Sequence, residues 1–271
     1  MRFVGVRLAV GVLVLAGVSS LAQGGAVTPK APKAAKTPYF VDPTLVDAAG
    51  LIAPPPAQDS SVTKAELAEI HRIEAARTPE QVKAAEYDDL HEDMFLYGTV
   101  LGPEFTEANL PVLAAFAKHV KNDVSVVGSP LKGVYGRPRP YNFDATLHPI
   151  CVTNKEASYP SGHSLNGFTL GYILAQMIPE KRAEILARAD DYAHNRMVCE
   201  AHYASDIEAS RAISRFLVGE MFASPRFERE MTAAKAEVRA KLRLPERRVS
   251  CRTGGTSYGP GLRGGPPDDR E

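Results

Sequence analysis

Apolar residues recur at the spacing of an α-helix along most of this chain, and this pattern restricts its fold more than any other feature. The clearest run repeats every three or four residues: Leu110, Leu113, Phe116, Ala117, Val120, Val124 and Val127. There is no internal repeat, and no alternating stretch is long enough to form a sheet. The sequence therefore predicts an all-α fold, a single-domain helical bundle of roughly eight helices.

Capping residues and chain breaks divide this pattern into separate helices. A serine at position 60 or 61 can cap a first helix, and Thr78 with Pro79 begins a second, which we expect to continue to Leu96. Thr106 opens the helix of the clearest run, and we expect an interruption at 128–130, where the sequence is Gly-Ser-Pro. Further helices are expected over 161–177, 179–196, 205–222 and 226–242, with a long loop over 141–160.

The N-terminus has the pattern of a targeting segment. Arg2 and Arg7 give it a positive end, an apolar run follows, and small residues at Ser20 and Ala22 suit a signal peptidase. We expect a cleaved signal peptide and a periplasmic or secreted protein; an uncleaved anchor is disfavoured because the apolar run is short for a bilayer. The expected divisions are a signal peptide over 1–22, a flexible leader over 23–37, the folded domain over 38–243 and a disordered tail over 244–271.

The charge balance excludes some classes of partner. The chain has 32 Lys and Arg against 32 Asp and Glu, so its formal net charge is zero. It has no excess positive charge for nucleic acid or an anionic membrane, and no later stretch is apolar enough to span a bilayer. We therefore expect neither nucleic acid nor a membrane as a partner, and any anion specificity has to come from a local basic cluster.

Three cysteines, Cys151, Cys199 and Cys251, lack the close pairing of a zinc site. Export permits disulfides, and Cys151 with Cys199 is the favoured pair because both lie near the motifs described below. Free buried thiols are nearly as good an interpretation. Cys251 falls in the expected tail and is left over.

The stretch from Asn195 to Asp206 holds a compact set of chemically active residue types. If the chain is helical from His202 onward, His202 and Asp206 lie one turn apart on one face, so the carboxylate can hold one imidazole nitrogen. Arg196 adds a planar, permanently charged group suited to phosphate or carboxylate. Taken alone, a His/Asp pair at this spacing is more often a surface hydrogen bond.

Two other clusters supply what this stretch lacks. Residues 132–140 carry Lys132 and Arg139, and residues 159–164 place Ser161, Gly162 and His163 at the start of an expected helix. The free N–H groups of such a helix start can bind an anion, and a histidine beside them can donate a proton to a leaving oxygen. An ordinary capped helix is the bland interpretation of this second cluster.

Together the clusters match the needs of phosphoryl transfer. Lys132, Arg139 and Arg196 are three cations for the three non-bridging oxygens of a phosphoryl group. No Asp, Glu and His set with metal-binding spacing is visible, so these cations would stand where metal ions act in other phosphatases. The sequence therefore predicts no metal site.

The order and spacing of the clusters resemble a known signature. Lys132 precedes Arg139-Pro140 by six intervening residues, residues 160–163 read Pro-Ser-Gly-His, and Arg196 precedes His202 by five. This pattern, completed by Asp206, is similar to the three-part signature of the type 2 phosphatidic acid phosphatase superfamily. The proline-rich stretch 51–60 also resembles the opening of the class A bacterial nonspecific acid phosphatases in that superfamily. The resemblance covers about residues 40–225, so residues 38–243 are expected to form an acid phosphatase domain.

The resemblance implies a role for each matched residue. His202 would attack phosphorus and form a phosphohistidine, Asp206 would orient His202, and His163 would protonate the leaving alcohol and then activate water. The implied phosphate-binding residues are Lys132, Arg139, Ser161, Gly162 and Arg196. The resemblance also implies a helical fold like that of the vanadium haloperoxidases, no cofactor, inhibition by phosphate or vanadate, and a homo-oligomer.

The expected function is that of an exported acid phosphatase that hydrolyses small organic phosphate monoesters without a metal ion. One alternative is a vanadate-dependent haloperoxidase, because phosphate and vanadate use the same pocket. Another is a non-catalytic exported phosphate-binding protein, which is disfavoured because every principal catalytic position is filled. The natural substrate and the balance between hydrolysis and phosphotransfer stay open.

Three positions depart from the family pattern or extend it. Asn195 stands where the family usually has serine, and either side chain can serve as a polar support. Ala157 stands where the class A loop usually has glycine, which puts the shape of that loop in question because alanine does not easily adopt a positive φ. Arg137 is an extra cation, for which we expect a solvated or interface role.

Overall fold

The computed structural model describes residues 36–42 and 47–245, and every regular element in these ranges is a helix. The all-α prediction is confirmed. The elements are α1 (Ser61–Ala76), α2 (Pro79–Leu90), the 3-10 helix η1 (Met94–Tyr97), α3 (Gly98–Leu101), α4 (Pro111–Tyr135), α5 (Pro140–Phe143), α6 (Gly162–Met177), the 3-10 helix η2 (Pro179–Lys181), α7 (Arg182–Val198), α8 (Ala204–Phe222) and α9 (Pro225–Lys241). The expected signal peptide, Cys251 and nearly all of the expected leader and tail lie outside the described residues.

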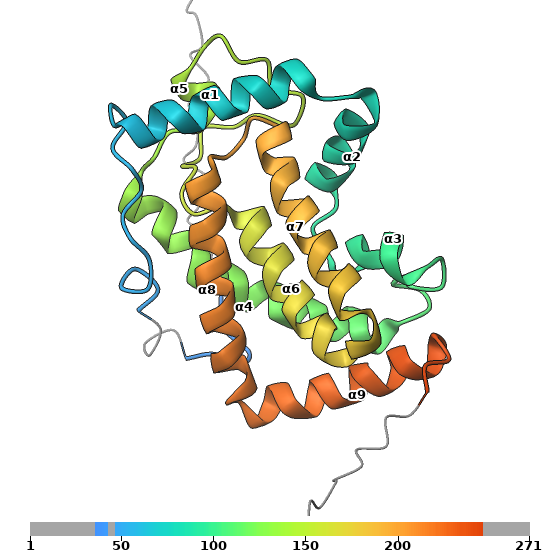
Figure 1. Cartoon of the computed structure of the whole chain (residues 1–271). Helices are drawn as coiled ribbons and strands as arrows, with labels where there is room; N and C mark the ends of the chain where they lie inside the picture. The colour runs from blue at the N-terminus through green and yellow to red at the C-terminus, as the bar shows by residue number, and fades with distance from the viewer. Residues whose placement is uncertain (1–35, 43–46, 246–271) are drawn as a thin grey trace, which may run out of the picture. The chain divides into compact units, whose positions relative to one another are not determined.

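Helix α6 is the centre of the bundle (Figure 1). It packs against α7, α8 and α4, while α9 crosses one end of the bundle and α1 crosses the other. Because α6 is surrounded, it is apolar on nearly all sides, with Leu165, Phe168, Leu170, Ile173 and Leu174 all buried. None of the described helices combines the length and apolar character needed to cross a lipid bilayer.

Helix α4 continues through the residues at which a break was expected. Residues 128–130 lie inside a helix that continues to Tyr135, so the predicted interruption is wrong. Pro130 removes only one backbone donor, and the packing of α4 against α6 and α9 holds the remaining turns. Gly128 serves packing instead, since a Cβ there would lie 2.5 Å from Cδ2 of Leu165 on α6.

Two other predicted boundaries are also wrong. Helix α4 begins at Pro111, not at Thr106, because a residue before proline is disfavoured in the helical conformation and Leu110 has φ −133° and ψ 59°. Helix α2 ends at Leu90, and the chain continues into η1 and α3 instead of one long helix. The expected caps do form at Ser60 and Thr78.

The connectivity brings the three sequence clusters to one end of the bundle. The last turn of α4, the first turn of α6, the last turn of α7 and the first turn of α8 meet beneath α1 (Figure 1). The backbone N–H of Ser161 donates to the carbonyl of Asp206 at 3.3 Å, which joins the starts of α6 and α8 directly. Gly136 caps the C-terminal end of α4, and its φ of 58° suits glycine and turns the chain towards Arg139.

Candidate active site

Five of the eight predicted site residues line one cavity of about 370 Å³ at this end of the bundle: Lys132, Arg139, Gly162, His163 and His202. The other three are buried behind its wall: Ser161, Arg196 and Asp206. Ser161 caps α6, and its hydroxyl oxygen accepts from the backbone N–H and the hydroxyl of Ser164. The clusters predicted from sequence therefore meet in space, in two layers.

The 156–157 loop positions the two cations of the first cluster. Lys132 Nζ donates to the carbonyl of Ala157 at 2.6 Å, and Arg139 Nε donates to the carbonyl of Glu156 at 3.1 Å. Ala157 is not among the described residues with a positive φ, so alanine fits this loop without backbone strain. Burial, and then the nearby Arg139, lower the pKa of Lys132 to about 8.

His202 lies one residue before the N-cap of α8, so the condition of a helix from His202 onward is not met. Its Nδ1 is 3.3 Å from Asp206 Oδ2 and 3.3 Å from the hydroxyl of Ser158. Arg139 Nη1 lies 3.1 Å from Nε2 and can only donate, so Nε2 carries the lone pair and Nδ1 the proton. Burial lowers the pKa of His202 well below its usual value, and Arg139, Arg196 and Lys132 lower it further.

Asp206 lies in the first turn of α8 with its carboxylate fully enclosed. Its Oδ2 accepts from the backbone N–H of Tyr203 at 2.9 Å and from the hydroxyl of Ser158, while its Oδ1 accepts from Arg137 Nη1 at 2.7 Å. Burial raises the pKa of Asp206, and these donors, Arg137 above all, oppose the rise.

The expectation of a solvated or interface role for Arg137 is wrong. The side chain is buried between Asp206 and Glu66, with 2.8 Å from its Nη2 to Glu66 Oε2. The two carboxylates compensate the charge of the guanidinium, as a buried charge requires.

His163 lies in the first turn of α6 and lines the cavity. Its Nε2 is 2.9 Å from Glu92 Oε1 and 3.3 Å from the carbonyl oxygen of Asp89. The hydrogen bond from His163 is the largest of the effects that lower the pKa of Glu92 to about 2, so Glu92 is a carboxylate at acid pH. Glu92 also pairs with Lys121 on α4 at 3.0 Å.

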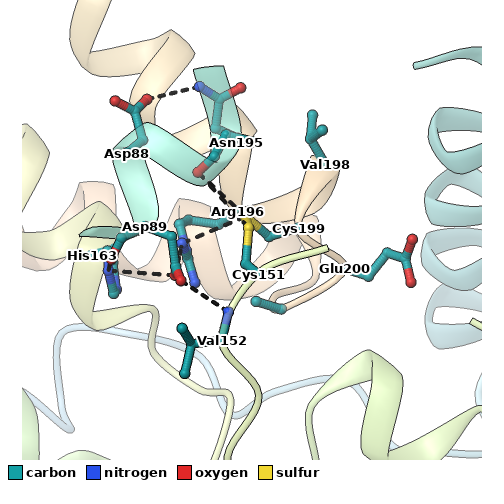
Figure 2. Close-up of a disulfide and its surroundings, with 12 residues drawn as sticks. Asp88, Asp89, Cys151, Val152, His163, Asn195, Arg196, Val198, Cys199 and Glu200 are labelled. Carbon is teal, nitrogen blue, oxygen red and sulfur yellow. Dashed lines mark hydrogen bonds and ion pairs between the residues drawn. A yellow bond between two sulfur atoms is a disulfide. The ribbon is translucent and has the colours of Figure 1, made fainter. Parts of the chain in front are cut away.

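Arg196 is held by Asp89. Its Nη1 donates to Asp89 Oδ1 at 2.7 Å, and Asp89 Oδ2 accepts from the backbone N–H of Val152 at 3.0 Å (Figure 2). Arg196 Nε is buried with no hydrogen-bond partner among the described residues. Asn195 points elsewhere, donating to Asp88 Oδ2 at 2.7 Å, and so acts as a polar support of α2 rather than of the cavity.

A disulfide joins Cys151 in the long loop to Cys199 at the end of α7, so the favoured pairing is confirmed (Figure 2). It lies beside the Asp89–Arg196 pair, with Cys199 Sγ 3.7 Å from Arg196 Nη1. Asp89 and the two sulfurs form a cluster of metal-ligand atom types. The sulfurs are bonded to each other, so they are not thiolate ligands, and this cluster does not fit a metal ion.

Several functional side chains were not predicted. Asp89, Glu92 and Ser158 contact predicted site residues, and Glu66 contacts Arg137, which pairs with Asp206. Glu66, Asp89 and Glu92 come from other parts of the chain. Only Ser158, three residues before Ser161, lies near a motif, and its position beside the Ala157 loop is the one signal that could have identified it.

The arrangement matches known proteins. A family model described as the PAP2 superfamily matches residues 112–230. An acid phosphatase of Zymomonas mobilis is 30% identical over 237 residues, which cover 81% of this chain and 84% of that protein. The chain belongs to the PAP2 superfamily. The resemblance inferred from the three motifs is thereby confirmed.

Two other proteins extend the comparison. A non-specific acid phosphatase of Providencia stuartii is 26% identical over 215 residues, covering 76% of this chain and 86% of that protein. Among solved structures, a bacterial vanadium-dependent iodoperoxidase aligns with a TM-score of 0.51 at 18% identity, covering 66% of this chain and 54% of that chain. This structural likeness shows a shared fold. Helices α1 and α2 precede the PAP2 segment of residues 112–230.

Proposed function

We propose that this PAP2 chain is an exported acid phosphatase that hydrolyses small organic phosphate monoesters through a phosphohistidine on His202, without a metal ion. Its relatives in Zymomonas mobilis and Providencia stuartii are named acid phosphatases, which makes it a phosphoric monoester hydrolase. The proposal rests above all on His202, whose Nε2 lone pair faces the cations of the cavity while Asp206 holds Nδ1.

In the first step, the Nε2 lone pair of His202 attacks phosphorus, and a P–N bond forms as the bond to the leaving oxygen breaks. His163 donates its proton to that oxygen, and the ionised Glu92 beside it balances the charge of the imidazolium. Lys132, Arg139 and Arg196 stabilise the negative charge on the non-bridging oxygens.

In the second step, neutral His163 takes a proton from a water molecule, whose oxygen attacks phosphorus. The P–N bond breaks, its electron pair returns to Nε2 of His202, and inorganic phosphate is released. Asp206 accepts from Nδ1 throughout and balances the positive charge of the phosphorylated ring.

Acid pH suits this chemistry. A nucleophilic imidazole has to be neutral, and the lowered pKa of His202 keeps it neutral where an ordinary histidine is protonated. Over the same range Lys132, with a pKa of about 8, stays charged. The site therefore keeps both its nucleophile and its cations at acid pH.

The cavity favours small polar leaving groups. Among the described residues, those that line it include no Phe, Tyr or Trp, and they include the polar side chains of Ser125, Ser129, Asn154 and Asn166. Hydroxyl and amide groups suit a polyol or sugar better than a flat base. Export is supported by the disulfide, which is stable in an oxidising compartment. Inhibition by phosphate or vanadate and a homo-oligomer stay predictions from the resemblance.

Release of phosphate from p-nitrophenyl phosphate at acid pH, in the presence of EDTA, tests the proposal directly. We expect turnover in the wild type, an acid-labile phosphoenzyme after a rapid quench, and neither in His202→Ala. Phosphate binding without turnover would identify a binding protein instead, and halide oxidation with added vanadate would identify a haloperoxidase. Full activity of His202→Ala would refute the mechanism.

A further inference from the structure

Arg137 lies directly behind the His202–Asp206 pair and does not line the cavity. Its side chain is 3% exposed, and its guanidinium carbon is 3.7 Å from the centroid of the Tyr203 ring. Nη1 donates to Asp206 Oδ1 and to the hydroxyl of Ser205, both at 2.7 Å. Arg137 therefore acts on the site only through the residues that it holds.

The backbone of Arg137 supports the same carboxylate from a second direction. Its carbonyl accepts from the backbone N–H of Ser158 at 2.7 Å, and the hydroxyl of Ser158 donates to Asp206 Oδ2. Side chain and main chain of one residue thus fix both oxygens of Asp206. A carboxylate held at both oxygens has one orientation towards His202.

Glu66 on α1 completes this arrangement. Its Oε2 accepts from Arg137 Nη2 at 2.8 Å, and its Oε1 accepts from the backbone N–H of Ser205 in the first turn of α8 at 2.7 Å. The side chain is buried, so neither contact is exchanged freely with water. Helix α1 thus holds both Arg137 and the helix end that carries Asp206.

Asp206, Arg137 and Glu66 form a buried group of three charged side chains. Asp206 is enclosed, and burial by itself would favour its protonated form, which could not balance a phosphorylated imidazole ring. Arg137 is the largest of the influences that oppose this protonation. Glu66 in turn balances part of the charge of Arg137, so the three side chains together leave a single negative charge beside His202.

We propose that Glu66 and Arg137 are positioning residues of this active site, which keep Asp206 ionised and directed at Nδ1 of His202. This inference rests on the proposed function, because it assigns His202 the role of nucleophile. It also gives α1 a part in the reaction, although α1 lies outside the PAP2 segment of residues 112–230.

Two variants with opposite expected shifts test it, with p-nitrophenyl phosphate as substrate. In Arg137→Met, the pKa of Asp206 should rise because its main cation is lost, so the acid limb of the kcat profile should move to higher pH. In Glu66→Gln, Arg137 keeps Asp206 as its only carboxylate partner, so the pKa of Asp206 should not rise. The acid limb of the kcat profile should therefore move to lower pH or stay in place. We expect kcat to fall about 100-fold in Arg137→Met and about fivefold in Glu66→Gln, as for loss of a buried charged partner.

Substrate binding provides the second readout. Arg137 does not line the cavity, so the inhibition constant of inorganic phosphate should change by less than about threefold in both variants. Arg137→Lys keeps the positive charge but not the contact with both Asp206 and Glu66. Its kcat should therefore lie between that of Arg137→Met and that of the wild type. Arg239→Met is the matched control, because Arg239 pairs with Glu180 at the far end of the bundle and should leave kcat and its pH profile unchanged.

The possible results distinguish a positioning role from a purely structural one. Equal losses of kcat and phosphate affinity, with no movement of the acid limb, would show a structural role only and would overturn the inference. If Arg137→Met does not fold, the shift in Glu66→Gln decides: an acid limb at higher pH overturns the inference. If the wild type forms no phosphoenzyme after a quench, the proposed function fails; if it does and Arg137→Met forms it equally fast, only this inference fails.

Discussion

The carboxylate of Asp89 and the guanidinium of Arg196 form a buried ion pair, with 2.7 Å between Oδ1 and Nη1. Since Arg196 approaches the site from behind the cavity wall, Asp89 determines where its remaining donors point. Asp89→Asn should weaken binding of inorganic phosphate about 10- to 100-fold, because a buried charge loses its partner. The measurement is the inhibition constant of phosphate.

The neighbouring residue gives a matched control for that change. Asp88 is also buried and paired, but with Arg188 and Asn195 rather than with Arg196. Asp88→Asn should lower the melting temperature and leave the inhibition constant near the wild-type value. Equal effects of the two variants on phosphate binding would contradict the assigned role of Asp89.

The fall in activity at high pH, the basic limb of the profile, should follow the loss of the positive charge of Lys132. A lysine with a pKa of about 8 is charged below that pH and loses its charge above it, so kcat/KM should fall as the pH rises through 8. Lys132→Arg keeps the charge at all relevant pH values and should move this limb upwards. If the basic limb is unchanged in Lys132→Arg, a group other than Lys132 is responsible for that limb.

The pKa of His202 itself can be followed in the free enzyme. Its pKa is lowered by burial first and then by Arg139, so removal of that cation in Arg139→Gln should raise it. An NMR titration of the His202 ring in the free enzyme should show protonation at higher pH in the variant. Titration at the same or a lower pH would mean that Arg139 does not act on the ring.

Glu92 should matter most when the leaving group is poor. It is the carboxylate beside His163, so Glu92→Gln should weaken proton donation to the leaving oxygen. For an alkyl phosphate we expect kcat/KM to fall about 10- to 100-fold, and for p-nitrophenyl phosphate much less, because nitrophenolate leaves without a proton. Equal losses for both substrates would argue against the assignment of His163 as the acid.

Loss of the disulfide should affect both stability and the site. Cys151→Ser with Cys199→Ser removes a cross-link that spans 48 positions, which should reduce the free energy of unfolding by about 2–4 kcal/mol. Because the adjacent Val152 N–H binds Asp89, phosphate affinity should fall as well. Calorimetry and the phosphate inhibition constant measure the two effects separately.

The sequence was most informative where a local pattern decides the structure. The N-cap at Ser161 and the run that becomes α6 were readable because capping and periodicity depend on nearby residues. The family signature then named eight candidate site residues, five of which line the cavity.

It was least informative about residues whose partners are distant. Arg137 reads as a surplus cation, since its acidic partners Glu66 and Asp206 are 71 and 69 positions away. Gly128-Ser129-Pro130 reads as a break, because nothing local shows that α6 packs against the glycine. Tertiary packing overrides local preference at both places.

The bond between Cys151 and Cys199 makes one covalent ring of α6, α7 and the connection between them. Glu180 and Lys181 in that connection and Arg182 at the start of α7 are exposed, within reach of a trypsin-like protease. A chain cut there would remain one molecule without reductant and would separate into two fragments only with it. Nicked and intact forms should therefore have the same mass until the sulfurs are reduced, apart from the added water.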